Sequence, residues 1–244
     1  MFFIKSKDAG KTSKVLPARI STETPIPSPI LMGQSIVLNF KENPIRIAWA
    51  SVNPNRVELY SNLKDQKLSE EIKVNKSCSV LVNGGFYSKT NTHLGLFITD
   101  FKATSPFSES TLLNGFLSIV TDEAHIQDFH PDNNPRIAIQ SGPLLMLNNQ
   151  MLNLEIKNDQ PDRRIVGATT KDGKLIFLAL YRDNSEYQGP LLTDLPEIIS
   201  LFKKESGIKI SDAINLDGGS ASAFISNYIL LRELAYIGSY FCVK

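Results

Sequence analysis

The sequence has 244 residues, and its 26 lysine and arginine residues nearly balance its 25 aspartate and glutamate residues, which leaves a net charge of +1. With 42% hydrophobic and 9% aromatic residues, the composition is that of an ordinary globular protein and excludes collagen-like, coiled-coil and wholly disordered chains. The near-neutral charge removes the general positive field that attracts nucleic acid, and the body of the chain has no local basic patch. We therefore expect no nucleic-acid partner.

Residues 1–30 differ in composition from the rest of the chain. The first 19 residues place five basic residues against one acid, Asp8, and prolines follow at positions 25, 27 and 29. This composition predicts a flexible basic arm with an extended, proline-rich linker, followed by one folded domain over residues 31–244. The apolar cluster at residues 2–4 is too short for a signal-peptide core, and no stretch is long enough for a membrane helix. A cytoplasmic location is the default expectation, and export stays open.

The body of the chain reads as short apolar strands bounded by turn residues. The predicted strands cover residues 34–40, 46–49, 56–60, 79–82, 94–98, 115–120, 136–140, 144–147, 164–168, 175–180, 213–216, 223–225 and 237–243. Together with few helices, they predict an α+β fold with mixed or antiparallel sheets.

One segment has the periodicity of an amphipathic helix, because the apolar residues Leu195, Ile198, Ile199 and Phe202 fall on one face. Asp194, with Glu197 three residues later, is placed to cap its first turn, and Gly207 is placed to end it. We expect this helix to cover a sheet face. Residues 64–74 form a weaker candidate for a second helix.

The two cysteines, Cys78 and Cys242, do not form a zinc-site or disulfide-framework pattern. We interpret them as two half-buried thiols in strands. A single bridge between them remains an alternative if the chain is exported.

Three glycine-bearing loops each follow an apolar strand. Residues 83–87 read Asn-Gly-Gly-Phe-Tyr, residues 140–143 read Gln-Ser-Gly-Pro, and residues 215–220 read Asn-Leu-Asp-Gly-Gly-Ser. Adjacent glycines let the backbone approach a ligand, and successive N–H groups can bind an anion, although each loop is also compatible with a simple tight turn. The third loop is the most informative, since a strand end presents Asp217 rigidly to a cleft. We expect the three loops to lie together at one common edge of the sheet.

Other candidates carry weaker signals. Arg163 and Arg164 precede a strand and offer planar forks for phosphate, but paired arginines also occur on solvated faces. His93, His125 and His130 lack the spacing of a zinc hydrolase, and the chain has no serine-hydrolase elbow, Walker loop or dinucleotide fingerprint. We expect no metal and no cofactor.

Taken in order, the motifs resemble those of the phosphodiester glycosidase family. The resemblance extends over about residues 75–243 and includes the three loops, Gly95-Leu96 with Asp100, and residues 163–167 with Asp172-Gly173. Phe101 and the pair Asn148-Asn149 depart from the family's usual turns. The resemblance implies a hydrolase that cleaves the sugar C1–O bond of a sugar-1-phosphodiester. The particular sugar, the aglycone and the oligomeric state stay open.

The resemblance also implies site residues. We expect Asp217 to act on the sugar as nucleophile or base, Arg163 to face the cleft and stabilise the phosphate, and Asn83 to position substrate; Asp217 should be ionised at neutral pH. The second acid is left open among Asp100, Asp183 and Glu186. The predicted substrate- and phosphate-binding residues are Gly84, Gly85, Gln140, Ser141, Gly142, Asn215, Gly218, Gly219 and Ser220.

Two alternatives belong to other classes. A non-catalytic module would bind a sugar phosphate or glycan in the same cleft without turnover. A phosphodiesterase that cuts the other P–O bond would use two metal ions, and three scattered histidines argue against it.

Overall fold

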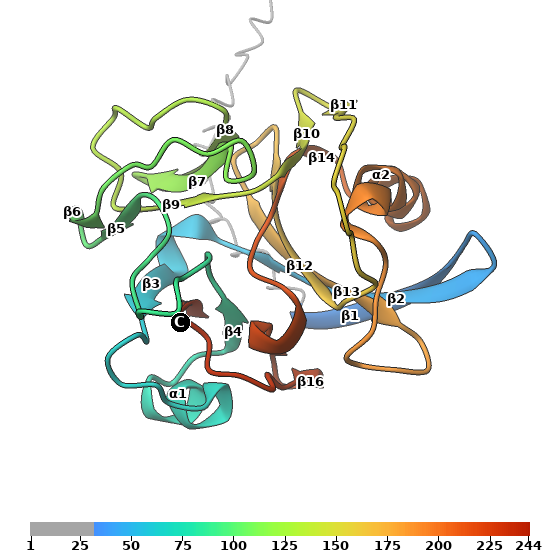
Figure 1. The fold of residues 1–244 in the computed structure, drawn as a ribbon, viewed down its shortest axis with the longest axis horizontal. Helices are drawn as coiled ribbons and strands as arrows, with labels where there is room; N and C mark the ends of the chain where they lie inside the picture. Colours follow the sequence, from blue (N-terminus) through green and yellow to red (C-terminus); the bar gives the residue numbers. More distant parts are fainter. Residues whose placement is uncertain (1–31) are drawn as a thin grey trace, which may run out of the picture.

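The computed structural model describes residues 32–244, and the predicted basic arm lies outside the described residues. The described chain folds into three sheets and two α-helices (Figure 1). Every strand pair within residues 32–244 is antiparallel, so the α+β architecture predicted from the sequence is confirmed.

The largest sheet has seven strands in the order β1-β2-β13-β12-β14-β10-β11. Their bounds are β1 Met32–Phe40, β2 Asn43–Val52, β10 Leu144–Leu147, β11 Gln150–Met151, β12 Arg164–Thr170, β13 Leu175–Arg182 and β14 Ile210–Asn215. Alternate side chains point to opposite sides of a strand, and the central strands are buried on both faces because a separate core cluster covers each face. In β13, Phe177 packs into the middle of the molecule, whereas Leu178 packs on the side of the long helix.

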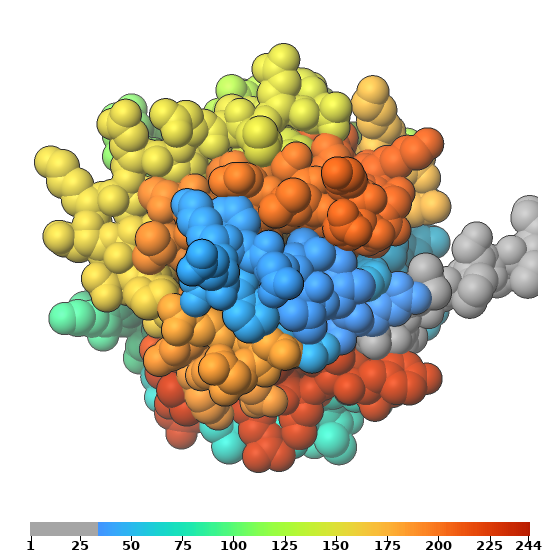
Figure 2. All heavy atoms as spheres, turned by 90° about the vertical axis from the view of Figure 1, so that its right-hand side faces the viewer, coloured from blue at the N-terminus to red at the C-terminus, as the bar shows by residue number. Residues whose placement is uncertain are grey.

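The long helix, α2 (Leu195–Ser206), covers one face of this sheet. The four residues of the predicted apolar face are 0% exposed, which confirms the predicted helix. Figure 2 shows α2 beside the β1–β2 hairpin on the outside of the molecule. Gly207 ends the helix with φ 73°, as predicted. The predicted cap at Asp194 is wrong: a 3-10 turn (η2, Leu192–Asp194) leads into α2, so Asp194 has a helical backbone and its carboxylate instead accepts a hydrogen bond from Lys41.

Two five-stranded sheets complete the fold. One has the order β16-β15-β4-β17-β3 and the other β6-β5-β9-β7-β8. Their bounds are β3 Val57–Ser61, β4 Val80–Asn83, β5 Phe97–Thr99, β6 Lys102–Ser105, β7 Gly115–Val120, β8 Glu123–Gln127, β9 Ile137–Ser141, β15 Phe224–Ile225, β16 Leu230–Leu231 and β17 Ser239–Val243. The remaining helical segments are η1 Pro54–Arg56, α1 Ser69–Asn75 and η3 Gly219–Ala221; α1 falls mostly within the weaker helix candidate.

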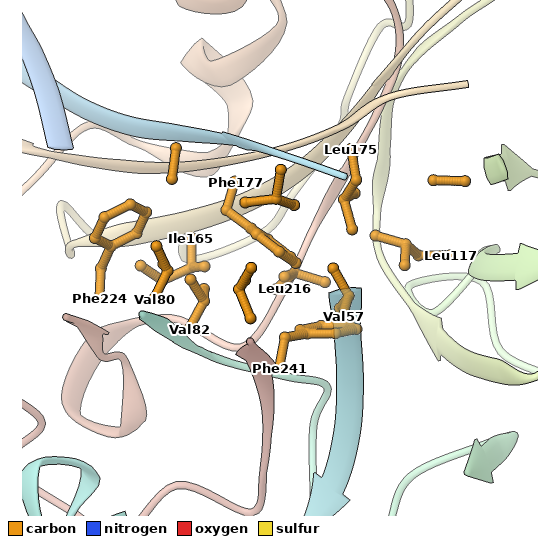
Figure 3. Packing of buried hydrophobic residues seen from close by; sticks show 14 of the residues in the cluster. Val57, Val80, Val82, Leu117, Ile165, Leu175, Phe177, Leu216, Phe224 and Phe241 are labelled. Atoms are coloured by element: carbon orange, nitrogen blue, oxygen red, sulfur yellow. The ribbon is translucent and has the colours of Figure 1, made fainter. Parts of the chain in front are cut away.

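Side chains from all three sheets meet in one core. Figure 3 shows Phe177, Ile165 and Leu216 from the large sheet and the chain after it packed against Val82 and Phe241. The rings of Phe177 and Phe241 lie 4.9 Å apart between centroids. This shared core fixes the ends of β4, β9 and β14 relative to one another, and those ends carry the three glycine loops.

The structure corrects the favoured interpretation of the cysteines. Cys78 and Cys242 form a disulfide, which was the alternative, and both residues are buried. Cys78 lies just before β4, and Cys242 lies in β17, which pairs with β4. Pairing of these strands brings the two sulfur atoms together although the cysteines are 164 residues apart in sequence.

Candidate active site

The second and third glycine loops are joined by hydrogen bonds around Asn215. The Ser141 hydroxyl donates to the Asn215 carbonyl (2.7 Å), and the Asn215 side-chain amide donates to the Gly142 carbonyl (2.9 Å). The Gly142 N–H also donates to the Asn215 carbonyl (3.1 Å). A Cβ on Gly142 would lie 2.1 Å from the Leu112 carbonyl oxygen, so only glycine allows this close approach.

The first loop binds the same segment two residues further along, at Asp217. The Asn83 side chain donates to the Asp217 carbonyl (2.7 Å), and the Asp217 N–H donates to the Gly84 carbonyl (3.1 Å). The Ala223 N–H donates to the Asn83 side-chain oxygen (2.8 Å), which closes the loop after Asp217 onto β4. Direct bonds therefore bring the three loops together at residues 215–217, as the sequence predicts.

The core fixes the position of Leu216, the residue before Asp217. Leu216 is 0% exposed and lies among Ile165, Val82 and Phe241 (Figure 3), and its N–H bonds to the Ile165 carbonyl at 2.8 Å. Asp217 follows Leu216 at the bend after β14 and is not part of this core. It is half-buried at the surface of the junction.

Burial raises the pKa of the Asp217 carboxyl to about 7, and a hydrogen bond from the Gly218 N–H opposes the shift only in part. The prediction that Asp217 is ionised at neutral pH is therefore wrong, because a carboxyl with a pKa of about 7 is only partly ionised there. It assumed an arginine beside the carboxylate, and the guanidinium groups of Arg163 and Arg164 are engaged elsewhere.

The structure also corrects the orientation of Arg163, whose side chain is 0% exposed and does not face an open cleft. Its guanidinium donates to the Ser222 hydroxyl (2.7 Å) and to the carbonyls of Ser222, Glu186 and Arg232. It also lies over the Tyr187 ring, 5.4 Å from the centroid. Arg163 thus holds three loops around the site in place. Arg164 is likewise engaged, by Asp159 and by backbone carbonyls.

Several other predicted binding residues have a supporting position. Asn83 and Gln140 are 1% and 2% exposed. The Gln140 amide bonds to the backbone of Leu96, Ser108 and Leu113, so it fastens the loop that precedes β7. The Gly219 N–H donates a hydrogen bond to the Arg163 carbonyl (2.9 Å) and is therefore not free to bind a phosphate. Of the predicted phosphate-binding groups, the Gly85 N–H and the Ser220 hydroxyl have no partner among residues 32–244.

Two buried side-chain atoms at this junction also lack a hydrogen-bond partner in the described chain: Asn215 Oδ1 and Ser239 Oγ. A Cβ on Gly84 would lie 2.4 Å from the latter, so the hydroxyl borders the first glycine loop. Unsatisfied buried polar atoms are rare in folded proteins, and these two are available to bind a ligand or water.

The three acids considered from the sequence occupy different places. Asp183 is paired with Arg46. Asp100 lies in the β5–β6 turn beside Arg136, at the end of β9 opposite Ser141. Glu186 lies beside Arg163, which bonds to its carbonyl.

Sequence reasoning missed two residues at the junction. The Asp162 carboxylate oxygen Oδ2 would lie 3.7 Å from a Cβ on Gly219. Tyr87 donates its hydroxyl to the Tyr236 carbonyl (2.5 Å), and burial, followed by the charge of Asp217, raises the pKa of Tyr87. Tyr87 was part of the first motif, but Asp162 belongs to none of the motifs and only the fold reveals its position.

The described chain has two cavities, which lie at different places. A cavity of about 200 Å³ lies against Tyr87, Tyr236 and Gly238 beside the junction. A larger one of about 470 Å³ is lined by β8 and by Thr170 and Asp212, so it lies at the opposite ends of β12 and β14 from Arg164 and Asn215. We therefore associate the smaller cavity with the candidate site.

The histidines lie outside the junction. His93 stacks on Phe97 and contacts the Ser61 hydroxyl, and burial lowers the pKa of His93 to about 4. No group of three or more potential ligand side chains in the described chain is placed to hold a metal ion. None of the helices within residues 32–244 has the length and apolar character needed to cross a membrane.

Comparison with known proteins decides the family. Residues 76–241, which contain all three glycine loops, match the phosphodiester glycosidase family. The chain belongs to this family. No curated protein matches the sequence.

Solved structures share the fold of this family member. The catalytic domain of zebrafish N-acetylglucosamine-1-phosphodiester alpha-N-acetylglucosaminidase, auto-inhibited by its pro-peptide, is 18% identical, with a TM-score of 0.70 over 89% of this chain and 84% of that one. A hypothetical protein from Synechocystis is 14% identical, with a TM-score of 0.61 over 88% of this chain and 64% of that one. A putative exported protein from Burkholderia pseudomallei is 9% identical, with a TM-score of 0.56 over 83% and 74%.

Proposed function

We propose that this phosphodiester glycosidase family member hydrolyses a sugar-1-phosphodiester at the bond between the anomeric carbon and the phosphate oxygen. The products are the free sugar and a phosphomonoester. The observation that carries the proposal is the convergence of the three family loops on residues 215–217, where they hold one carboxyl with a pKa of about 7. A proton-transfer group works best when its pKa lies near the working pH.

In the proposed reaction, the C1–O bond breaks and its electron pair leaves with the phosphate oxygen. Asp217 in its carboxylate form either accepts a proton from the water that bonds to C1 or first bonds to C1 itself. A phosphate ester is already a good leaving group, so stabilisation of its charge matters more than protonation. The Gly85 N–H and the Ser220 hydroxyl are the unpaired donors in the described chain that can supply it.

The buried polar residues have a supporting role in this proposal. Asn83 binds the Asp217 backbone, and Arg163 holds the loops that contain Glu186, Ser222 and Arg232. We add Asp162, beside Gly219, as a candidate second carboxylate, because Asp183 is paired with Arg46 and Asp100 lies beside Arg136. Glu186, beside Arg163, is the alternative. Whether one or two displacements occur is reported by the anomer of sugar that is first released.

The test is incubation with a panel of aryl and alkyl sugar-1-phosphodiesters, with both products followed by mass spectrometry. We expect free sugar and phosphomonoester from the wild type. Asp217→Asn should lower turnover by a factor of at least about 10² to 10⁴, because the amide keeps the shape of the carboxyl but neither accepts a proton nor attacks carbon. Asp122→Asn, an exposed acid outside the junction, is the matched control.

Other outcomes decide between alternatives. Release of sugar phosphate means that the other P–O bond is cut. Binding without products, by wild type and Asp217→Asn alike, establishes a non-catalytic binding module. Inhibition by a chelator identifies a metal requirement.

We also propose that the protein folds in an oxidising compartment, which revises the default expectation of a cytoplasmic location. A buried disulfide between distant strands is typical of proteins outside the reducing cytosol. The similar Burkholderia protein is described as exported, which supports the same proposal.

A further inference from the structure

We propose that the cavity beside Tyr87 is a subsite for one neutral sugar ring, and that this ring is the sugar released from the phosphodiester. The inference rests on the proposed function and extends it to the class of sugar. We call this cavity the neutral pocket; it is lined by residues 62, 63, 66, 87, 91 and 235–238.

The neutral pocket is connected to the reacting carboxyl through backbone bonds. Gly238, in its wall, precedes Ser239, whose carbonyl accepts the Gly84 N–H (2.8 Å). The Gly84 carbonyl in turn accepts the Asp217 N–H (3.1 Å). Tyr87 links the neutral pocket to Asp217, since it lines the pocket and the charge of Asp217 helps to raise its pKa. These contacts place the neutral pocket next to the first glycine loop, which binds the backbone of Asp217.

The walls of the neutral pocket are fixed to each other. Asn62 is 2% exposed; its N–H donates to the Gly238 carbonyl (2.8 Å), and its side chain donates to the Ile237 carbonyl (2.9 Å). The Tyr87 hydroxyl is bonded to the Tyr236 carbonyl. A Cβ on Gly238 would lie 2.5 Å from the Tyr87 ring, so the ring packs directly on this glycine. Such a preformed cavity loses little entropy when a ligand binds.

The chemistry of the lining selects the ligand. None of the lining residues is charged, so the neutral pocket has no group to pair with a phosphate. Gln66 and Asn91 are exposed, and their side-chain amides have no hydrogen bond to any described residue. An amide offers both donors and acceptors, which is what a ring of hydroxyl groups requires, and the tyrosine rings offer apolar faces. The volume of about 200 Å³ limits the ligand to about one ring.

A sugar ring in this pocket has two possible sources, the departing sugar or a sugar within the aglycone. The adjacency to Asp217 assigns it to the departing sugar. Two substrate series separate the sources. One varies the departing sugar among glucose, galactose, mannose, N-acetylglucosamine and glucuronic acid with a constant phenyl phosphate. The other keeps the departing sugar constant and varies a sugar in the aglycone.

The variants remove the amides without disturbing the backbone. Gln66 and Asn91 both have positive φ angles, 47° and 54°, which glycine adopts without strain. Gln66→Gly and Asn91→Gly should each raise KM for the preferred neutral sugar by about tenfold, the cost of a hydrogen-bonding partner, and leave kcat within about threefold. Asn134→Gly is the matched control, because Asn134 is exposed, has a φ of 47° and lies outside the pocket.

A second readout does not require turnover. The same free sugars are titrated into wild type, the two pocket variants and Asp217→Asn by ligand-observed NMR. We expect a neutral sugar to bind wild type and Asp217→Asn, to bind the pocket variants about tenfold more weakly, and to be preferred over glucuronic acid.

The outcomes are distinguishable. Turnover that is unaffected by the pocket variants overturns the subsite and leaves the proposed function standing. Pocket-dependent sugar binding without turnover of any substrate keeps the subsite and overturns the proposed function. KM effects confined to the aglycone series overturn the assignment to the departing sugar.

Discussion

Asp217 combines a functional advantage with a cost to folding. Its carboxyl is held at the junction of three loops, and burial keeps its pKa at about 7, compared with 3.8 in water. Such a group exchanges a proton near neutral pH, but its ionised form is poorly solvated in the folded protein. Activity and stability should therefore respond to pH in opposite directions.

The activity prediction follows from the proposed use of the carboxylate form. We expect kcat/KM for a phenyl sugar-1-phosphodiester to rise about tenfold per pH unit below pH 7 and to level off above it. The measurement is a pH–rate profile from pH 5 to pH 9 at constant ionic strength. Activity that falls as pH rises through 7 would instead make Asp217 the general acid.

The stability prediction uses the same shift. Below pH 3.8 the carboxyl is protonated in both states, so it adds no pH dependence. Between pH 3.8 and about 7 the folded state retains a proton that the unfolded state has released, so the free energy of unfolding falls as pH rises. Asp217→Asn should therefore have a higher melting temperature than wild type at pH 8 and an equal one near pH 4.

Calorimetry across this pH range tests the stability prediction. Asp122→Asn, at an exposed position, should follow the wild type at every pH. An Asp217→Asn protein that is less stable than wild type at pH 8 would contradict the proposed cost of the buried charge.

The predicted site residues show what a sequence can and cannot specify. The motifs predicted that the three loops meet, because each glycine or polar residue followed a strand end. They did not reveal which side chains face solvent. Arg163, Asn83 and Gln140 are residue types that often bind ligands, yet here they are buried and bond mostly to backbone atoms of distant segments. Such partners depend on tertiary packing and leave no local pattern.

At the level of elements, the long apolar strands and the amphipathic helix were predictable because their period is strong. The missed strands, β6, β8, β11 and β16, are short or largely exposed. In β8, Glu123, His125 and Gln127 alternate with buried Ala124 and Ile126, and these two apolar residues are too few to give a clear strand signal. The predicted cap at Asp194 was wrong because the 3-10 turn η2 precedes α2, so the helical backbone already includes Asp194.

The end of α2 provides a prediction for a single backbone position. Gly207 has a φ of 73° and nothing within 4 Å of where a Cβ would be. Gly207→Ala should therefore destabilise the protein by about 1 kcal/mol through backbone strain alone. Gly207→Asn should cost less, because asparagine tolerates the left-handed region better. Chemical denaturation of the three proteins measures this order, and an alanine variant as stable as wild type would contradict it.

At the level of the whole molecule, the end of the chain is part of the core that supports the site. β17 pairs with both β3 and β4, and Phe241 packs against Phe177 of the large sheet (Figure 3). Ser239, at the start of β17, accepts the Gly84 N–H of the first glycine loop. The last strand thus connects the sheets, the disulfide and the candidate active site.

The disulfide should therefore stabilise the site as well as the fold. It closes a loop between residues 164 apart, and a loop of this length restricts the unfolded chain by about 5 kcal/mol in the chain-entropy account. The double variant Cys78→Ser/Cys242→Ser should lose about 2–5 kcal/mol of unfolding free energy in denaturant titrations. Reductant should lower the wild-type midpoint toward that of the double variant and leave the double variant unchanged.

Because β17 contacts Gly84 and the β4 end, the double variant should also lose activity at lower denaturant concentrations than wild type. Equal midpoints for wild type and the double variant under oxidising conditions would show that strand pairing alone holds the end of the chain.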